Sequence, residues 1–342
     1  MCVVTEIDST TVAIAAADRL FDEYGEEAGL AVPEPADRAA ARAAVTRLGE
    51  RFAALRGAVR HVLARSSDQA AHLSDDDLQG LSEVVQNAED LGASEVRILL
   101  QQGELLLAHN GAPVRLPDVL ALAMPWLTTK EEDAESTGRF GIGLMTLRAI
   151  SPLLEIHSGH YDVRFGNSTV TAVAGLRTPS GFVGPEWTVL RVPFEDGSLT
   201  VGDISRWLSG WTDSALLFLR HVTRIVLLGG DLRPLRELRL ERGREKAEHL
   251  LLGGAMRQVR LREVESADGT RWLHCTAVVS APEGVRRAGK ATADTVAVSL
   301  AIPRGGPAPG QVHVRLPVTA TALPFRIGAC VTDLLWAQAG SH

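Results

Sequence analysis

Apolar residues recur at three- and four-residue spacing near the start of the chain, a pattern that predicts helices. Residues from about 10 to 72 are rich in Ala, Arg, Glu and Leu, and a Pro-containing break at AVPEPADR divides them. Regularly spaced apolar residues define one helical face, namely Val45, Leu48, Phe52, Leu55, Val59 and Leu63. We therefore expect two or three helices that form a packing or dimer-forming lead.

A second helical pattern, LSDDDLQGLSEVVQNAEDLGA, has a clear start and a clear stop. Ser74 is a suitable N-cap, and the three aspartates after it lie where the helix dipole favours acidic side chains. Gly92 ends the helix. Along this helix, Glu83, Asn87 and Asp90 share one face beside an apolar stripe. Taken alone, these three residues would form an ordinary solvated face.

Strand patterns follow the second helix. The runs EVRILLQ and ELLLAHN are joined by a turn at Gln102 and Gly103. A helical segment, LPDVLALAMPWL, and an acidic stretch, TTKEEDAESTG, come next, and four strands are then predicted in LLEIHSG, YDVRFG, STVTAVAGL and EWTVLRVPF. This order indicates an α+β fold, a two-layer sandwich with helices on one face of a mixed, mostly antiparallel sheet.

Composition and charge narrow the function classes. With 342 residues, 45% hydrophobic and 23% charged, the chain matches average soluble globular proteins. A formal net charge of −7 argues against bulk affinity for nucleic acid or anionic membrane. Three scattered cysteines lack zinc or redox spacing, and the acidic N-terminus does not fit a signal peptide. We therefore expect a cytoplasmic protein without a membrane partner.

A glycine-rich segment, STGRFGIGL, precedes another helical pattern. Gly138, Gly141 and Gly143 remove side chains where backbone N–H groups could approach phosphate oxygens, and a helix from about Leu144 adds a favourable dipole. A tight turn before a helix has the same pattern, and the chain has no P-loop motif. The amide oxygen of Asn87 could bind Mg²⁺, so the segments together favour a triphosphate site.

Four segments stand in the order and approximate spacing of the GHKL ATPase superfamily, namely SEVVQNAEDLGA, LLLAHNGAPV, LTTKEEDAESTGRFGIGL and EWTVLRVPF. The chain most resembles the sacsin-type branch of chaperone-like ATPases, which is similar to the N-terminal ATPase domain of the 90-kDa heat-shock proteins. The resemblance covers roughly residues 78–192. It implies the Bergerat ATP-binding fold, ATP hydrolysis to ADP and phosphate, and the cofactors ATP and Mg²⁺.

The resemblance also implies roles for individual residues. Glu83 matches the catalytic glutamate, which orients and deprotonates the attacking water, and Asn87 matches the magnesium ligand. Asp90 lies on the same helix face near the nucleotide. Thr188 matches a strand threonine that helps to hold adenine through water, and Lys130 matches a phosphate contact before an acidic lid, EEDAES. The second glycine box, which wraps the phosphates, matches Gly138, Arg139, Phe140, Gly141, Ile142 and Gly143.

The first glycine box departs from the family pattern Asp-x-Gly-x-Gly. In HNGAP, His109 takes the place of the aspartate that accepts a hydrogen bond from the adenine amino group, and Asn110 and Gly111 follow it. Either His109 in a neutral tautomer or Asn110 through its amide oxygen could accept that hydrogen bond. Pro113 replaces the second glycine and stiffens the turn. Recognition of adenine is therefore the open question at this site.

A composition shift near PFEDGSLTVGD completes the expected domain organisation. We expect a helical lead at 1–73, a GHKL-type nucleotide-binding domain at 74–199, a helical connector at 200–222 and a strand-rich second domain at 223–342. The last part resembles the start of a chaperone middle domain. Protein clients and homodimer contacts often come from downstream domains in this superfamily. The chain stops soon after this domain begins, as in a truncated protein or one that has lost the rest.

Two functional hypotheses follow. The first is an ATP-binding, chaperone-like module in which slow magnesium-dependent hydrolysis accompanies lid closure and domain rearrangement. The second is a non-hydrolysing nucleotide sensor or scaffold with a degenerate adenine pocket at His109. A DNA-acting role is disfavoured by the net charge. Both hypotheses expect Glu83, Asn87, His109 or Asn110, and the backbone amides of 138–143 to line one pocket.

Overall fold

A computed structural model of the chain divides into two compact units. The structure describes residues 8–23, 31–55, 57, 78–101, 103–124, 144, 147, 150–166, 169–194, 199–252, 255–280, 295–306, 310–314, 316–321 and 325–330. The first unit combines Met1–Glu131, Gly138–Ser205 and Val226–Leu235, and the second combines Glu132–Thr137, Arg206–Ile225 and Arg236–His342. The chain has an α+β fold in which sheets dominate, as the sequence pattern predicts.

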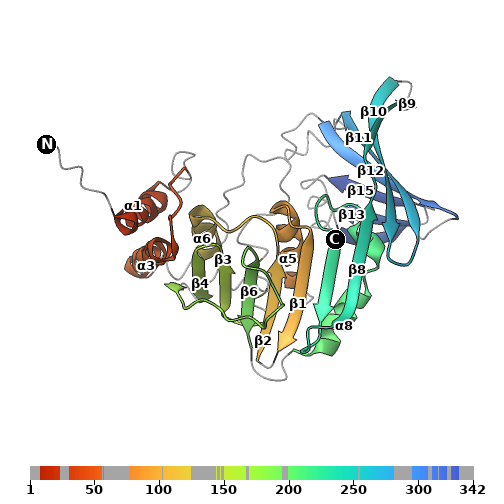
Figure 1. The fold of residues 1–342 in the computed structure, drawn as a ribbon. Helices are drawn as coiled ribbons and strands as arrows, with labels where there is room; N and C mark the ends of the chain where they lie inside the picture. The colour runs from red at the N-terminus through yellow and green to blue at the C-terminus, as the bar shows by residue number, and fades with distance from the viewer. Residues whose placement is uncertain are drawn as a thin grey trace. The chain divides into compact units, whose positions relative to one another are not determined.

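An antiparallel sheet forms the centre of the first unit (Figure 1). Its strands are β1 (Glu95–Gln101), β2 (Glu104–His109), β3 (Leu154–Ser158), β4 (Tyr161–Gly166), β5 (Thr169–Ala172) and β6 (Thr188–Pro193). They stand in the order β1-β2-β6-β3-β4-β5, and each neighbouring pair is antiparallel. The part of β7 (Arg224–Leu228) that belongs to this unit lies beside β1. The strand predictions in this region are confirmed.

Apolar residues are buried on both faces of this sheet. On one face, Ile98, Leu107 and Leu190 stand opposite one another across β1, β2 and β6. On the other face, neighbours such as Leu99 and Leu106 pack against Phe182, a fully buried residue of the segment between β5 and β6. Both faces of the central strands are therefore covered, so these strands read as nearly continuous apolar runs.

The first unit contains the helices α1 (Ser9–Asp22), α3 (Arg38–Ala54), α5 (Gln79–Asp90) and α6 (Leu116–Ala123). In the described part of the predicted lead, α1 packs against α3, and α3 packs against β5. The predicted apolar face of α3 is buried at Val45, Leu48 and Phe52. Asp37 caps α3 by accepting a hydrogen bond from the backbone N–H of Ala40 at 2.8 Å.

The helix that carries the predicted catalytic face is α5. It ends before Gly92, whose φ of +73° is the left-handed conformation that glycine adopts readily, so the predicted stop is confirmed. The predicted N-cap Ser74 lies outside the described residues. Gly80 allows a close approach near the start of α5, because a Cβ atom there would lie 2.9 Å from the backbone nitrogen of Leu147.

The second unit is built around a larger sheet. Its strands are β8 (Pro234–Arg242), which begins in the first unit, β9 (Lys246–Leu252), β10 (Ala255–Ser266), β11 (Arg271–Ser280), β12 (Thr295–Arg304), β13 (Gly310–Val314), β14 (Leu316–Thr321) and β15 (Arg326–Cys330). They are ordered β14-β13-β15-β12-β11-β10-β8, and β9 also pairs with β10. The β13–β15 pair is parallel, so this sheet is mixed. The predicted richness in strands is confirmed.

The segment 200–222, predicted to be a helical connector, is helical only in part. Helix α8 (Val201–Ser209) ends early, and only a short 3-10 turn, η2 (Asp213–Leu216), follows it. The guanidinium group of Arg242 donates hydrogen bonds to the carbonyl oxygens of Leu219 at 2.8 Å and Val222 at 3.0 Å, and also to those of Leu216 and Arg220. A distant side chain thus satisfies carbonyl groups that a continued helix would have paired internally.

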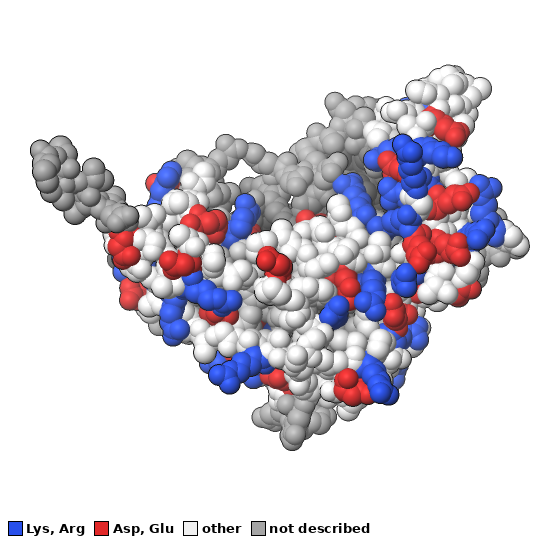
Figure 2. All heavy atoms as spheres, in the orientation of Figure 1, with Lys and Arg blue, Asp and Glu red and all other residues white. Residues whose placement is uncertain are grey.

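Charged side chains of both signs gather over strands of the second unit, as Figure 2 shows. Several of them form local ion pairs, including Arg262 with Glu245 at 2.9 Å and Arg271 with Glu265 at 3.0 Å. The basic groups of these strands are therefore at least partly compensated by neighbouring carboxylates. In the part of the chain that the structure describes, no helix has the length and apolar character that crossing a membrane requires.

Candidate functional site

Three predicted site residues meet on the helix-covered face of the first sheet. The register of β2 and β6 places His109 directly opposite Thr188, so both side chains point to the same face. Asn87 comes from α5, and it lines the same small cavity as the two strand residues. All three are buried, with exposed fractions of 6% for Asn87, 3% for His109 and 2% for Thr188.

The cavity between α5 and the sheet is narrow and mostly apolar. Its walls are formed by Val84, Asn87, Leu91, His109, Val114, Leu144, Ile156, Thr188 and Leu190. An apolar wall with a few converging polar groups is typical of small-molecule sites. The volume is only about 10 Å³, which is close to the minimum that one water molecule needs. In this conformation the cavity has no room for a purine base.

His109 is a neutral hydrogen-bond donor in this environment. Burial lowers the pKa of His109 to about 4, so the imidazole is uncharged at pH 7. The backbone N–H of Gly111 donates to Nδ1 of His109 at 3.3 Å, which leaves the ring proton on Nε2. Toward a ligand, His109 therefore offers an N–H group, whereas the aspartate of the family pattern offers an acceptor.

Thr188 belongs to a short chain of buried hydrogen bonds. Its hydroxyl oxygen lies 2.6 Å from Oγ of Ser158, which in turn accepts a hydrogen bond from the backbone N–H of Val114 at 2.9 Å. The chain ties β6, β3 and the segment after β2 together beside the cavity. Sequence reasoning missed Ser158 because it belongs to no motif. Strand alternation in LEIHS is the only signal that places it on this face.

The side chain of Asn110 forms its hydrogen bonds away from the cavity. Its Oδ1 accepts hydrogen bonds from the backbone N–H groups of Ser94 at 2.9 Å and Glu95 at 3.0 Å, and its Nδ2 donates to Ser94 Oγ at 2.9 Å. The side chain is exposed and fastens the turn between α5 and β1. Of the two candidates for contacting the base, only His109 lines the cavity.

Gly111 makes the close approach between HNGAP and the end of α5 possible. A Cβ atom at this position would lie 2.8 Å from the carbonyl oxygen of Leu91 and 3.1 Å from the backbone nitrogen of Ala93. The next residue, Ala112, donates its backbone N–H to the same Leu91 carbonyl at 2.8 Å. The glycine of this box is therefore explained by the packing of two segments that flank the cavity.

The other predicted site residues are distributed differently. Glu83 and Asp90 lie on α5 and are half-buried, and neither is among the described residues that line the cavity. Leu144, which follows the second glycine box, is helical and contributes to the cavity wall. The remaining candidates lie outside the described residues, and they are Lys130, Gly138, Arg139, Phe140, Gly141, Ile142 and Gly143.

Comparisons with known proteins do not assign the chain to a family. No protein-family model matches it, and no curated protein matches it. Among solved structures, the chain is similar to the N-terminal domain of a DNA repair protein, with a TM-score of 0.40 and 12% sequence identity. That similarity covers 78% of this chain and 87% of the other. At this level it carries no information on function, which has to be inferred from the site.

Proposed function

We propose that the chain is an ATP-binding, chaperone-like module of the cytoplasm that hydrolyses ATP slowly with Mg²⁺. The observation that carries this proposal is the convergence of Asn87, His109 and Thr188 on one buried cavity. These residues come from three separate segments of the sequence, namely α5, β2 and β6. A solvated helix face, the alternative for Asn87, does not account for a buried amide that lines a cavity with two other polar groups.

The donor chemistry at the cavity suits a magnesium nucleotide. Asn87 offers an uncharged amide oxygen, which is a hard ligand of the kind that Mg²⁺ binds. Glu83 lies one helical turn earlier on α5, where a carboxylate can orient a water molecule and accept its proton. A bound nucleotide would supply the phosphate oxygens that complete the coordination of the metal.

The available space sets a condition on binding. Because the cavity holds about one water molecule, its walls have to separate before a base can enter. Leu91 and Leu144 line it with apolar side chains, and their displacement exposes apolar surface that a purine ring would cover again. We therefore expect nucleotide binding to be coupled to a widening of the gap between α5 and the sheet.

The proton on Nε2 of His109 leads to a specific expectation about the base. An N–H group at this position pairs with an acceptor atom, such as a ring nitrogen or the 6-oxo group of a purine, and does not accept from the amino group of adenine. Inosine triphosphate should therefore bind at least as tightly as ATP. A His109→Asp variant, which replaces the donor with an acceptor, should shift the preference toward ATP.

Calorimetric titration and a phosphate-release assay with Mg²⁺ test the proposal directly. Asn87→Ala should weaken magnesium-dependent binding about tenfold, and Glu83→Ala should abolish turnover while binding is retained. Gln86→Ala is the matched control, since it removes an amide from the neighbouring position of α5 that does not line the cavity. If the wild type binds neither ATP nor inosine triphosphate at millimolar concentration, the proposal fails.

A second candidate function is a non-hydrolysing nucleotide sensor or scaffold. It is favoured by one observation, namely that Glu83 is not among the described residues lining the cavity while the neutral His109 is. The two functions differ in a single measurement. Saturable binding with no phosphate release above that of the Glu83→Ala variant supports the sensor, and release that depends on Glu83 supports the ATPase.

A further inference from the structure

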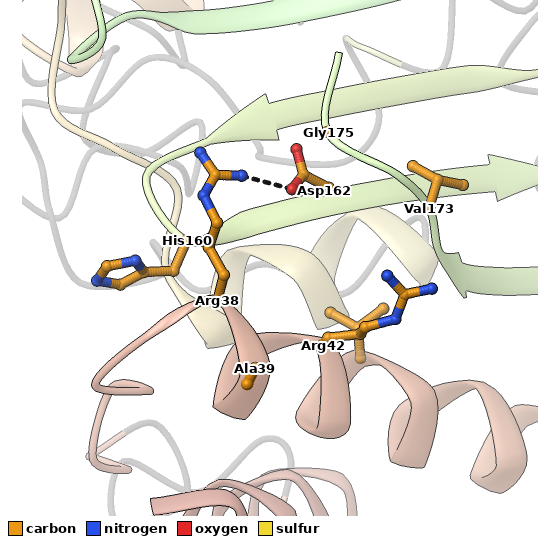
Figure 3. Close-up of a pocket in the computed structure, with 8 residues that line it drawn as sticks. Arg38, Ala39, Arg42, His160, Asp162, Val173 and Gly175 are labelled. Carbon is orange, nitrogen blue, oxygen red and sulfur yellow. Dashed lines mark hydrogen bonds and ion pairs between the residues drawn. The ribbon is translucent and has the colours of Figure 1, made fainter.

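A larger cavity lies elsewhere in the first unit, where α3 packs beside β4 and β5. It has a volume of about 390 Å³, which falls in the range of about 300–1,000 Å³ that small-molecule sites occupy. Figure 3 shows the side chains around it, which come from the first turns of α3, the β3–β4 turn, β4 and the segment after β5. They are Arg38, Ala39, Arg42, Val45, His160, Asp162, Val173 and Gly175. None of them lines the cavity at His109.

The lining of this larger cavity has two arginines, Arg38 and Arg42, and one carboxylate. Its carboxylate, Asp162, is already bonded through both oxygens, because Oδ2 accepts a hydrogen bond from Arg38 at 2.6 Å and Oδ1 lies 2.8 Å from Nδ1 of His157. Arg42 stands one helical turn after Arg38 on the same side of α3. Among the described residues, Arg42 has no carboxylate partner. Within the described part of the chain, the exposed guanidinium group of Arg42 is thus the one at this cavity without a carboxylate beside it.

The shape of the cavity depends on Gly175. A Cβ atom there would lie 3.6 Å from Asp162 Oδ2 and 3.8 Å from Arg38 Nη1, which are ordinary contact distances. A side chain at this position would therefore fit on the backbone without a clash and would project toward the arginine. With glycine, the space in front of Arg38 stays open. A substitution at residue 175 consequently offers a way to obstruct the space in front of Arg38 without a clash with the helix or the strand beside it.

We propose that this cavity binds a small organic phosphate. A phosphomonoester carries a charge of about −1.5 to −2 at pH 7 and three acceptor oxygens. The guanidinium forks of Arg38 and Arg42 match such oxygens in bidentate geometry. A phosphate between the two arginines compensates the charge of Arg42 and leaves the Arg38–Asp162 pair in place, so Asp162 acts as the group that positions Arg38.

Amide chemical-shift titration of the 342-residue chain tests this site. The probes are inorganic phosphate and glycerol 3-phosphate, with succinate as the carboxylate comparison. Saturable shifts are expected at Arg38, Arg42 and Gly175 with either phosphate. Arg42→Gln should weaken phosphate binding about tenfold, which corresponds to the loss of one charge-assisted contact of about 1.4 kcal/mol. Gly175→Leu should abolish binding, because its side chain would occupy the space in front of Arg38.

Two control variants separate this site from other causes. Arg244→Gln removes one exposed positive charge from the second unit, so it should leave phosphate binding unchanged and exclude an effect of net charge. Asn87→Ala should also leave it unchanged, so failure of the ATP proposal and failure of this one are distinguishable. Phosphate binding that survives both Arg42→Gln and Gly175→Leu, or equal affinity for succinate, would overturn the proposal.

Discussion

Close packing limits which residues the segments beside the His109 cavity can carry, and Gly111 is the clearest example. Replacing its hydrogen with a methyl group would place a carbon 2.8 Å from the Leu91 carbonyl oxygen, so one of the two segments has to move. We expect Gly111→Ala to lower the free energy of unfolding by about 1–3 kcal/mol in urea denaturation. Gly230→Ala, where no atom lies within 4 Å, should change it little. Equal effects of the two substitutions would contradict this explanation.

Burial of His109 makes the stability of the first unit depend on pH. The pKa of this imidazole is about 4 in the folded chain and 6.5 in its ordinary state, so the unfolded chain binds the proton more tightly. The free energy of unfolding is therefore unaffected by His109 above pH 6.5. It falls by roughly 3 kcal/mol as the pH drops from 6.5 to 4 and the unfolded chain takes up the proton.

Urea unfolding between pH 7.5 and pH 4.5 should show this loss in the wild type, and a smaller one in His109→Asn. The carbon-bound ring protons of His109 report its pKa directly by nuclear magnetic resonance. A value near 6.5 would mean that the ring is accessible to water in the folded chain, and the closed cavity would then be the wrong description of this site.

At the residue scale, the sequence predicted which side chains could lie near one another. It did not predict which of them already form hydrogen bonds with other parts of the chain. Helical spacing placed Asn87 on one face with Glu83 and Asp90, whereas Thr188 was predicted only from the family resemblance. His109 and Asn110 were equivalent candidates in HNGAP. They differ only because the amide of Asn110 is bonded to the turn at Ser94, sixteen residues earlier, and such a contact leaves no trace in local sequence.

At the element scale, turns and helix ends were predictable because single residues specify them. Gly103, with φ of +74°, closes the β1–β2 hairpin, and Gly92 ends α5 in the same conformation. The segment after Ser209 was not predictable in this way. Its apolar pattern favours a helix, but its carbonyl groups are bonded by Arg242, whose position depends on the folding of β8.

The role of Arg242 leads to a prediction about the second unit. Arg242→Lys keeps the charge but loses the planar fork, so several carbonyl groups of the 216–222 segment lose their donor. We expect a loss of about 1–3 kcal/mol in thermal unfolding. Arg239→Lys is the control, because its exposed ion pair with Glu241 contributes little. A Lys variant at 242 that is as stable as the control would show that the carbonyl groups are satisfied in another way.

At the scale of the whole molecule, the sequence predicted a helical lead, a nucleotide-binding domain, a connector and a second domain in linear order, but not a chain that returns from one unit to the other. The composition shift near residues 196–222 indicated a single boundary. The chain instead passes into the second unit after Ser205 and returns to the first with Val226–Leu235, which adds a strand beside β1. A return of ten residues does not change the local composition. It is fixed by burial of Val226 and Leu228 in the core cluster at Phe182.

Because each unit has its own core, a nucleotide bound at the His109 cavity should protect the two units unequally. Ligand binding stabilises the folded state that binds it by about 2.7 kcal/mol at a concentration 100 times the dissociation constant. Hydrogen exchange with and without Mg²⁺ and ATP should therefore slow in α5, β2 and β6, which supply Asn87, His109 and Thr188. Amides of β11 and β12 in the second unit should exchange at unchanged rates.

The same experiment separates the cavity from the phosphate site on α3. Glycerol 3-phosphate should protect amides around Arg42 and Gly175 and leave those around Asn87 unchanged, since the two cavities share no lining residue. The Asn87→Ala variant should lose the protection by ATP at α5 and keep the protection by glycerol 3-phosphate at α3. Protection by ATP that is strongest at α3 would mean that the nucleotide binds through its phosphates at Arg38 and Arg42, and the His109 cavity would then not be the nucleotide site.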